Sequence, residues 1–369
     1  MIYLDHAATT RPDDAVIEAM AEAMRRCWAN PSAPYAAAGE ARRALRQARA
    51  AVAGMLNAAP QEVLFTSSGT EANNQAALLA GGGHAVVSAI EHASVLNAVK
   101  ARAASVTLVP PGPDGIVRPE AVVRAIRPDT KLISVMLANN ETGVIQPVGE
   151  IAGLAHARRI PMHCDAVQAF GQVPVDVRAL GVDMLTLSGH KLYGPRGIGA
   201  LWARQGVPLQ SLLRGGGQEQ GLRSGTEDVA AACGLGVAAQ MAQADMAARA
   251  ARERKMLAAF AGAVRAGVPE VRLLCEASPR LPGLCAMLLP GISSEEAVAA
   301  LDMMGVQVSG GAACASRDRA VSHVYRALGL TDNEARRVIR VSIGRHTTSG
   351  EMECAAAAIV KVCREHREN

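Results

Sequence analysis

The stretch Asp183-Met184-Leu185-Thr186-Leu187-Ser188-Gly189-His190-Lys191 is an apolar run that ends in a hydroxyl, an imidazole and an amine. A short run of this kind, followed by glycine, predicts a buried β-strand at residues 183–187. Similar runs alternate with longer helical patterns between residues 60 and 205. This alternation predicts an α/β fold with a mostly parallel central sheet flanked by helices. The remaining strands are expected at residues 62–66, 84–90, 105–109, 131–137, 160–164 and 199–203.

The length of the chain bears on its domain organisation. A chain of 369 residues exceeds the usual size of one hydrophobic core, so two domains are expected. The segments become shorter after about residue 270, which indicates a smaller α+β domain. We expect a large domain over residues 17–254 and a small domain that combines residues 1–16 with residues 255–369.

The composition argues against several classes of protein. No run of 18 or more apolar residues occurs, which argues against a membrane span. The first residues lack the basic and apolar regions of a signal peptide, so a cytoplasmic location is expected. Eight cysteines without a CxxC pair argue against a zinc site and against a disulfide framework, and no metal is expected. A formal charge of +4, with arginines spread along the chain, argues against direct nucleic-acid binding.

Polar side chains follow five of the expected strands. Because open parallel sheets bind ligands at the carboxyl ends of their strands, these groups are expected at one edge of the sheet. Together they offer hydroxyls, a histidine, an amide, a carboxylate and a lysine, which predicts a cofactor site. The segments are Ser67–Glu71, Glu91-His92, Asn139–Glu141, Asp165 and Ser188–Lys191.

Two of these segments suit parts of a phosphorylated pyridine cofactor. Ser68-Gly69-Thr70 opens a helix, where free N–H groups and the helix dipole favour a phosphate, although serine and threonine are common there simply as helix caps. Asp165 would keep a pyridine nitrogen protonated and so make the ring a better electron sink. Alternatively, Asp165 caps the helix that follows its strand.

Lys191 is one of only five lysines, against 33 arginines. A lysine, whose unperturbed pKa is about 10.4, attacks carbonyl groups well only when that pKa is depressed or when it already forms a Schiff base. Most lysines are solvated surface groups. The preceding Ser-x-His and the scarcity of lysine favour a functional residue, and we expect Lys191 to form a Schiff base with pyridoxal 5'-phosphate.

The residues from Ser188 to Gly199 resemble the lysine signature of NifS/IscS-type cysteine desulfurases, which belong to the class V aminotransferase group. The resemblance covers nearly the whole chain, with many motifs in the same order. They are Tyr3–Thr10, Thr66–Asn73, Glu91-His92, Asn139–Gly143, His163–Gln168, Gly215–Glu219, Arg223–Thr226, Ser309–Ser316 and Ile339–Ser342. The resemblance implies the fold type I architecture of pyridoxal-phosphate enzymes and a homodimer.

The resemblance also implies a role for each motif residue. His92 would stack on the pyridine ring and take part in proton transfers, and Asn140 would lie near the ring and the substrate. Arg340 would bind the substrate carboxylate, for which its guanidinium fork is suited, although an arginine in an apolar strand could instead point to solvent. The other implied cofactor ligands are Gly69, Thr70, Ser188 and His190 for the phosphate, Thr226 from the partner subunit, Asp165 for the ring nitrogen and Gln168 for the phenolic oxygen.

Cys314 aligns with the nucleophile of the desulfurases. A free cysteine is most often a small buried hydrophobic residue. A Gly-Gly loop after a strand is instead suited to a thiolate that approaches a bound substrate and then leaves with its sulfur. A thiol with a pKa near 8.5 is mostly protonated at neutral pH, so the site has to supply a base, either His92 or the substrate amine.

The implied reaction converts L-cysteine to L-alanine. Sulfur passes to Cys314 as a persulfide and then to an acceptor, which could be a protein or a small thiol. The residues do not rank iron–sulfur cluster assembly, tRNA thiolation or a dedicated biosynthetic pathway as the destination. An iron–sulfur scaffold or a tRNA-thiolation enzyme is the expected kind of partner.

Three positions depart from the family pattern. Ala36 and Leu137 stand where relatives often have histidine, and Gly310 replaces a common serine. These changes bear on the entrance, on partner docking and on substrate preference. A selenocysteine lyase or another C–S lyase on the same scaffold would share all the cofactor-binding residues and stays an alternative, whereas an aminotransferase has no use for Cys314. A non-catalytic sulfur-relay subunit is a further alternative, against which the retained lysine, cysteine and arginine argue.

Overall fold

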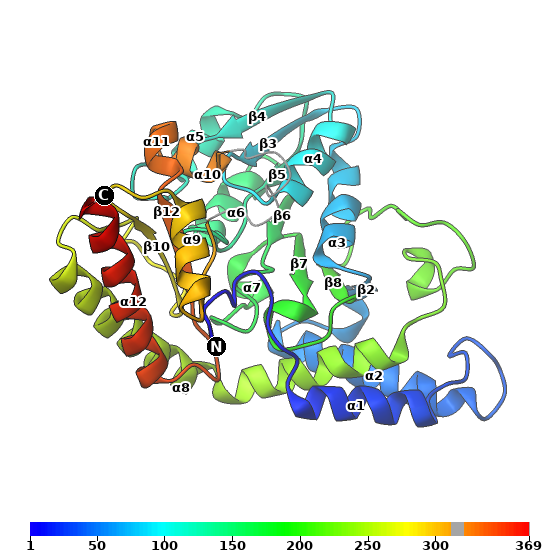
Figure 1. The fold of residues 1–369 in the computed structure, drawn as a ribbon. Coiled ribbons are helices and arrows are strands. Elements are labelled where there is room, and N and C mark those ends of the chain that lie inside the picture. Colours follow the sequence, from blue (N-terminus) through cyan, green and yellow to red (C-terminus); the bar gives the residue numbers. More distant parts are fainter. Residues whose placement is uncertain (311–320, 369) are drawn as a thin grey trace.

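The computed structural model describes residues 1–310 and 321–368 (Figure 1). Its central sheet has seven strands in the order β2-β8-β7-β6-β5-β3-β4. The strands are β2 (Val63–Thr66), β8 (Gly199–Ala203), β7 (Met184–Ser188), β6 (Met162–Asp165), β5 (Thr130–Ser134), β3 (His84–Ser88) and β4 (Ser105–Val109). Only β8 runs against its neighbours β2 and β7, so the expectation of a mostly parallel sheet is confirmed.

Helices cover both faces of this sheet because alternate strand residues point to opposite sides. On β2, Leu64 packs with α3 (Gly69–Ala76) and α4 (Ala93–Arg102) on one face. Val63 and Phe65 pack on the other face, in the larger apolar cluster. That cluster includes side chains of α2 (Ala38–Met55), α6 (Val148–His156) and α8 (Val229–Gly267).

A second, smaller sheet follows in the chain. It is antiparallel, in the order β12-β10-β9, with β9 at Arg272–Leu273, β10 at Leu284–Leu288 and β12 at Val338–Ser342. Beside it, β1 (Ile2–Tyr3) pairs with β11 (Val306–Gln307). The remaining helices are α1 (Asp14–Arg26), α5 (Pro119–Arg124), α7 (Val177–Leu180), α9 (Ser294–Met303), α10 (His323–Ala327), α11 (Asp332–Ala335) and α12 (Ser349–Glu368).

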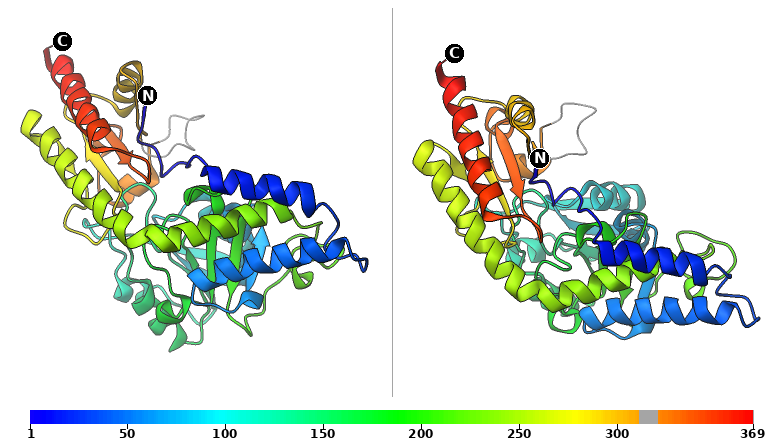
Figure 2. Two further views of the ribbon diagram at one scale, coloured as in Figure 1. Left: turned by 90° about the horizontal axis from the view of Figure 1, so that it is seen from below. Right: turned by 60° about the horizontal axis from the view of Figure 1, so that its bottom comes forward.

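The long helix α8 connects the two regions. Figure 2 shows its first half beside α1 and α2, and its second half beside α12. Side chains from Ala231 to Ala242 belong to the larger apolar cluster, whereas Met256 to Val264 belong to a second cluster that also contains Leu4. The domain boundary at residue 254 stays a prediction. No helix within residues 1–310 and 321–368 is long and apolar enough to span a membrane.

Glu253 lies on α8 between these two clusters. Its side chain is fully buried, and neither carboxylate oxygen has a hydrogen-bond partner in the described part of the chain. Burial raises the pKa of this carboxyl from 4.5 to about 7, although Arg249 and Arg252 act in the opposite direction. The folded protein therefore holds a proton on Glu253 at pH values where the unfolded chain has lost it.

We expect Glu253→Gln to flatten part of the pH dependence of stability. Because the pKa is raised on folding, the contribution of Glu253 is fully present below pH 4.5 and is lost as the pH rises to about 7. The loss amounts to about 3 kcal/mol. Urea unfolding at pH 5 and pH 8 measures it: the wild type should lose stability relative to the variant, while the exposed control Glu295→Gln follows the wild type. Equal pH dependence in wild type and Glu253→Gln would contradict the expectation.

Candidate active site

Four of the predicted segments meet at the carboxyl edge of the large sheet. Asp165 is the last residue of β6, and Lys191 ends the short turn helix η3 (Gly189–Lys191) directly after β7. His92 is the N-cap of α4, four residues beyond β3. Gly69 begins α3, three residues beyond the end of β2. The strand ends thus deliver these residues to one edge, as parallel pairing requires.

A chain of hydrogen bonds joins Asp165 to His92. Asn73 Nδ2 donates to Asp165 Oδ2 at 2.8 Å and to Ser94 Oγ at 2.9 Å. His92 Nδ1 lies 2.7 Å from that Ser94 Oγ and accepts from Ser94 N at 3.1 Å. Because Nδ1 accepts, the proton of the neutral ring is on Nε2. Burial lowers the pKa of His92, which favours this neutral form.

Asp165 ends β6 and is followed by a turn, so the alternative that it caps the next helix is wrong. Oδ1 accepts from Val167 N at 2.9 Å, within that turn. Oδ2 accepts from the Asn73 amide, and the side chain is almost completely buried. A carboxylate held in this way is a suitable partner for a protonated ring nitrogen. No role was predicted for Asn73, although it lies one helical turn beyond Gly69 and Thr70.

The N-terminal segment lies against Lys191. Lys191 Nζ donates to Ala7 O at 2.5 Å and to Ala8 O at 2.8 Å, and Gln168 Nε2 donates to the same Ala7 O at 2.8 Å. His190 Nδ1 lies 3.2 Å from Thr9 Oγ1, and burial lowers the pKa of His190 to about 4. Lys191, Gln168 and His190 are therefore brought together by residues 7–9, a contact that strand-end reasoning did not predict.

The start of α3 forms a close cradle. Ser68 caps the helix by accepting from Glu71 N at 3.1 Å, so the capping interpretation is confirmed for that residue. A Cβ added at Gly69 would lie 2.8 Å from a methyl of Val167 and 3.5 Å from Ser188 Cβ. Glycine is thus required for the close approach of α3 to the ends of β6 and β7. Thr70 is exposed at the same helix start, where a phosphate would be stabilised.

Arg340 is buried on β12, with only 2% of its surface exposed, so the alternative that it points to solvent is wrong. Arg340 Nη2 pairs with Asp5 Oδ1 at 2.6 Å, and Nη1 donates to Asn140 O at 2.9 Å. Arg340 Nε is buried and has no hydrogen-bond partner within the described residues. The guanidinium is therefore held beside Asn140 with donor capacity left for a carboxylate.

Cys314 lies outside the described residues, and the chain on either side of residues 311–320 is attached close to the site. Before that stretch, Arg340 N donates to Ser309 O at 2.7 Å. After it, Ser322 Oγ donates to the buried carboxylate of Glu141 at 2.6 Å. His323 Nε2 lies 2.9 Å from the backbone oxygen of Glu91, next to His92.

Thr226 is exposed at the end of the glycine-rich segment 213–226. This segment is fixed by the buried Glu219, which pairs with Arg49 at 2.5 Å and accepts from Phe65 N on β2 at 2.9 Å. Arg223 pairs with Glu71 on α3 at 3.0 Å. Neither ion pair was predicted, since the partners are far apart in sequence.

Comparisons with known proteins show the family of this chain. A family model described as aminotransferase class V matches residues 2–354. The chain belongs to this family. Cysteine desulfurase IscS 1 of Archaeoglobus fulgidus is 38% identical over 362 residues, which cover 96% of this chain and 94% of the relative. A cysteine desulfurase of Cereibacter sphaeroides is 40% identical over 364 residues, which cover 95% of this chain and 93% of the relative.

Solved structures of the same group have the same fold. A NifS-like protein from Rickettsia africae superposes with a TM-score of 0.91 at 30% identity. The superposition covers 98% of this chain and 99% of the Rickettsia chain. A structure described as SspA in complex with cysteine has a TM-score of 0.82 at 34% identity, with 94% and 100% covered. The resemblance to NifS/IscS-type desulfurases and the fold type I architecture are thereby confirmed.

Proposed function

We propose that this class V protein is a pyridoxal-phosphate-dependent cysteine desulfurase that converts L-cysteine to L-alanine. The observation that supports it most is the meeting of Lys191, Asp165 and His92 at one sheet edge, within a chain whose relatives are named cysteine desulfurases. Arg340 supplies a carboxylate-binding group, and Cys314 supplies a thiol that an aminotransferase would not need.

The described residues fit pyridoxal 5'-phosphate. Gly69, Thr70, Ser188 and His190 would hold the phosphate, because the start of α3 combines N–H groups, hydroxyls and a position where a Cβ would collide. Lys191 would bind the cofactor covalently, and Asp165 would pair with its ring nitrogen. Gln168 would contact the phenolic oxygen, and His92 would lie over the ring. When bound, the cofactor supplies an electron sink for the carbanion formed at the substrate Cα.

The protein's own residues then orient the substrate and move its protons. Arg340 would bind the carboxylate of L-cysteine beside Asn140. The Lys191 amine is the base that would take the proton from Cα, and Asp165 would keep a proton on the ring nitrogen. His92 is held neutral with its proton on Nε2, so it is suited to exchange protons with substrate groups.

Sulfur transfer would use Cys314. Its thiolate would attack the substrate sulfur, forming a sulfur–sulfur bond while the carbon–sulfur bond breaks and its electron pair stays with the carbon fragment. That fragment gains protons and leaves as alanine, while Cys314 keeps the sulfur as a persulfide. An acceptor thiol or an acceptor protein, such as an iron–sulfur scaffold or a tRNA-thiolation enzyme, would then take it.

A homodimer is part of this proposal. Ile17, Met24 and Trp28 are 48%, 62% and 75% exposed along α1 and just beyond its end, an apolar stripe that a second copy would cover. A partner subunit would also bring its exposed Thr226 to the phosphate site. Sedimentation velocity tests this: a dimer is expected for the wild type, and a monomeric wild type would contradict the proposal.

The function is tested by incubating the protein, loaded with pyridoxal phosphate, with L-cysteine and a reductant. We expect alanine and sulfide in equal amounts. A parallel incubation with L-selenocysteine measures the preference between the two substrates. If neither substrate yields alanine, the proposal is wrong.

A further inference from the structure

The turn that contains Lys191 is held by its backbone from several sides. His190 O accepts from Thr10 N at 3.0 Å and from Thr10 Oγ1 at 2.9 Å. Lys191 O accepts from Gln172 Nε2 at 3.3 Å. Tyr193 N donates to Thr10 Oγ1 at 2.8 Å, and Tyr193 O accepts from Asp13 N at 3.1 Å. The position of the lysine therefore depends on groups that do not touch its side chain.

Tyr193 is the strained residue of this turn. Its φ angle is +63°, a left-handed conformation that is uncommon for a residue with a bulky side chain. The ring is nevertheless among the most deeply buried in the described chain, with 1% of its surface exposed. Such a conformation persists only where surrounding contacts enforce it. Arg345 is one of the residues that contact the Tyr193 ring and hydroxyl.

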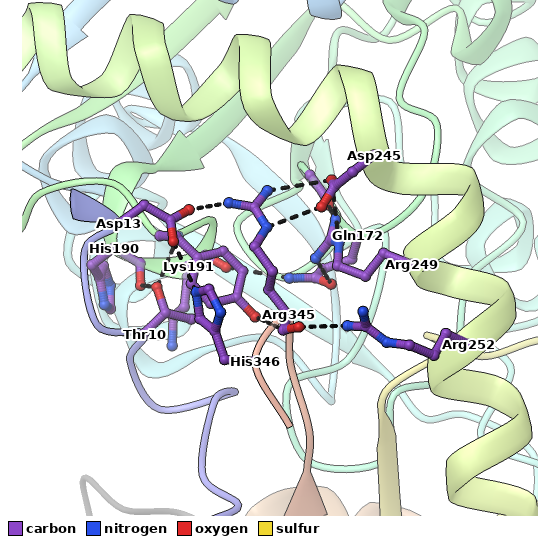
Figure 3. A network of polar contacts seen from close by, with 12 residues as sticks. Thr10, Asp13, Gln172, His190, Lys191, Asp245, Arg249, Arg252, Arg345 and His346 are labelled. Atoms are coloured by element: carbon purple, nitrogen blue, oxygen red, sulfur yellow. Dashed lines mark hydrogen bonds and ion pairs between the residues drawn. The ribbon is translucent and has the colours of Figure 1, made fainter. Parts of the chain in front are cut away.

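Arg345 follows β12 and makes three kinds of contact with this region, of which Figure 3 shows the ion pairs with Asp13 and Asp245. Its backbone N–H donates to the Tyr193 hydroxyl at 2.6 Å, and its guanidinium carbon lies 4.8 Å from the centre of the Tyr193 ring. The guanidinium pairs with both oxygens of Asp245 on α8, at 3.0 Å and 3.3 Å. It also pairs with Asp13 Oδ2, and Asp13 is the residue whose N–H holds Tyr193 O.

The neighbours of Arg345 keep it in this place. A Cβ added at Gly344 would lie 2.1 Å from the Tyr193 hydroxyl, so only glycine lets the chain come this close to the ring. His346 Nε2 lies 2.9 Å from Asp13 Oδ1, and Arg252 Nη2 donates to Arg345 O at 2.5 Å. Arg345 is thus fixed by α8 on one side and in turn fixes the segment before α1 and the lysine turn on the other.

We propose that Arg345 is a positioning residue for Lys191, acting through Tyr193 and Asp13. Two segments that surround Lys191 depend on Arg345. One is the turn 189–194, and the other is the segment 7–13, whose Ala7 and Ala8 carbonyls accept from Lys191 Nζ. This inference rests on the proposed function only in assigning Lys191 as the lysine that binds the cofactor.

The test compares Arg345→Met, Arg345→Lys and Tyr193→Phe. Tyr193→Phe keeps the buried ring and removes only the hydroxyl that Arg345 N–H contacts, so it stays informative if Arg345→Met does not fold. Arg265→Met is the matched control. Arg265 lies on α8 and, like Arg345, forms an ion pair, but its pair with Glu276 is exposed and far from the lysine turn in sequence.

Two readouts are used on the whole protein. Hydrogen exchange of peptides that cover residues 186–196 reports the turn without any turnover. The pH titration of the visible absorbance of the cofactor-loaded protein reports the surroundings of Lys191 Nζ. We expect Arg345→Met to speed exchange of the turn about 10-fold, to shift the titration by about half a pH unit and to lower kcat about 10-fold, with KM for L-cysteine within about 3-fold.

The remaining variants complete the comparison. Arg345→Lys should recover part of each effect, and Tyr193→Phe should show the same direction at about 3-fold. Arg265→Met should match the wild type. The inference is overturned if folded Arg345→Met and Tyr193→Phe match the wild type in exchange and titration, or if Arg265→Met changes both equally. If the shifts occur but the wild type makes no alanine from cysteine, the inference about Lys191 stands and the proposed function fails.

Discussion

Lys191→Ala is expected to abolish the visible absorbance of bound pyridoxal phosphate and to lower turnover of L-cysteine by at least about 10³-fold. The amine would bind the cofactor covalently and act as the base at the substrate Cα, and a well-placed base alone is worth roughly 10²- to 10⁴-fold. The turn and the N-terminal segment hold Nζ against Ala7 O and Ala8 O, so the substitution removes the amine from this place.

Absorbance after gel filtration and an assay for alanine measure these two effects. Lys255→Ala is the matched control, because Lys255 is an exposed lysine of α8. Lys191→Ala also loses hydrogen bonds to two carbonyls, so a small loss of stability of about 1–2 kcal/mol is expected for it in thermal or urea unfolding. Turnover by Lys191→Ala within 10-fold of the wild type would show that another residue is the base.

Cys314→Ser is expected to keep the cofactor absorbance and to lose sulfide release by at least about 100-fold, since a hydroxyl is far less ionised and less nucleophilic than a thiol. The cofactor should be unaffected, because none of its expected ligands lies within residues 311–320. The described residues on either side of this segment are attached close to the proposed substrate site. Ser309 pairs with Arg340, the expected carboxylate ligand, and Ser322 bonds to Glu141, next to Asn140.

Sulfide and alanine are measured with reductant present, and mass spectrometry of the protein without reductant scores the added sulfur atom. Cys354→Ser is the matched control, because Cys354 is an exposed cysteine on α12. It should release sulfide at the rate of the wild type. Full sulfide release by Cys314→Ser would refute the assignment of the nucleophile while leaving the cofactor site intact.

The parts of the site that could be predicted are those encoded by local patterns. Asp165, Lys191 and His92 follow apolar runs, and parallel strands place the ends of such runs at one edge. Asn73 could not be found in this way. Its amide joins Asp165 and Ser94 across separations of 92 and 21 residues, and a helical asparagine has no pattern that distinguishes it from a surface residue.

Arg340 illustrates the same limit within one strand. Its position in an apolar strand allowed both a carboxylate-binding side chain and a solvent-facing one. Only the arrangement of β12 against the N-terminal segment, which brings Asp5 to within 2.6 Å across 335 residues, shows that it is buried and paired. The ion pairs of Arg345 with Asp13 and Asp245 were unpredicted for the same reason.

Lys191 itself shows what the sequence alone determined about this protein and what the tertiary structure decided. The apolar run 183–187, the polar residues after it and the order of motifs along the chain determined the α/β fold and the family, and they predict which lysine binds the cofactor. These features depend on neighbouring residues, whose spacing is set by strand and helix geometry. The surroundings of the amine were decided by contacts between distant segments. The Ala7 and Ala8 carbonyls accept from Lys191 Nζ, and Arg345 N–H donates to the Tyr193 hydroxyl in the lysine turn. Such contacts depend on how whole elements pack, which no local pattern records.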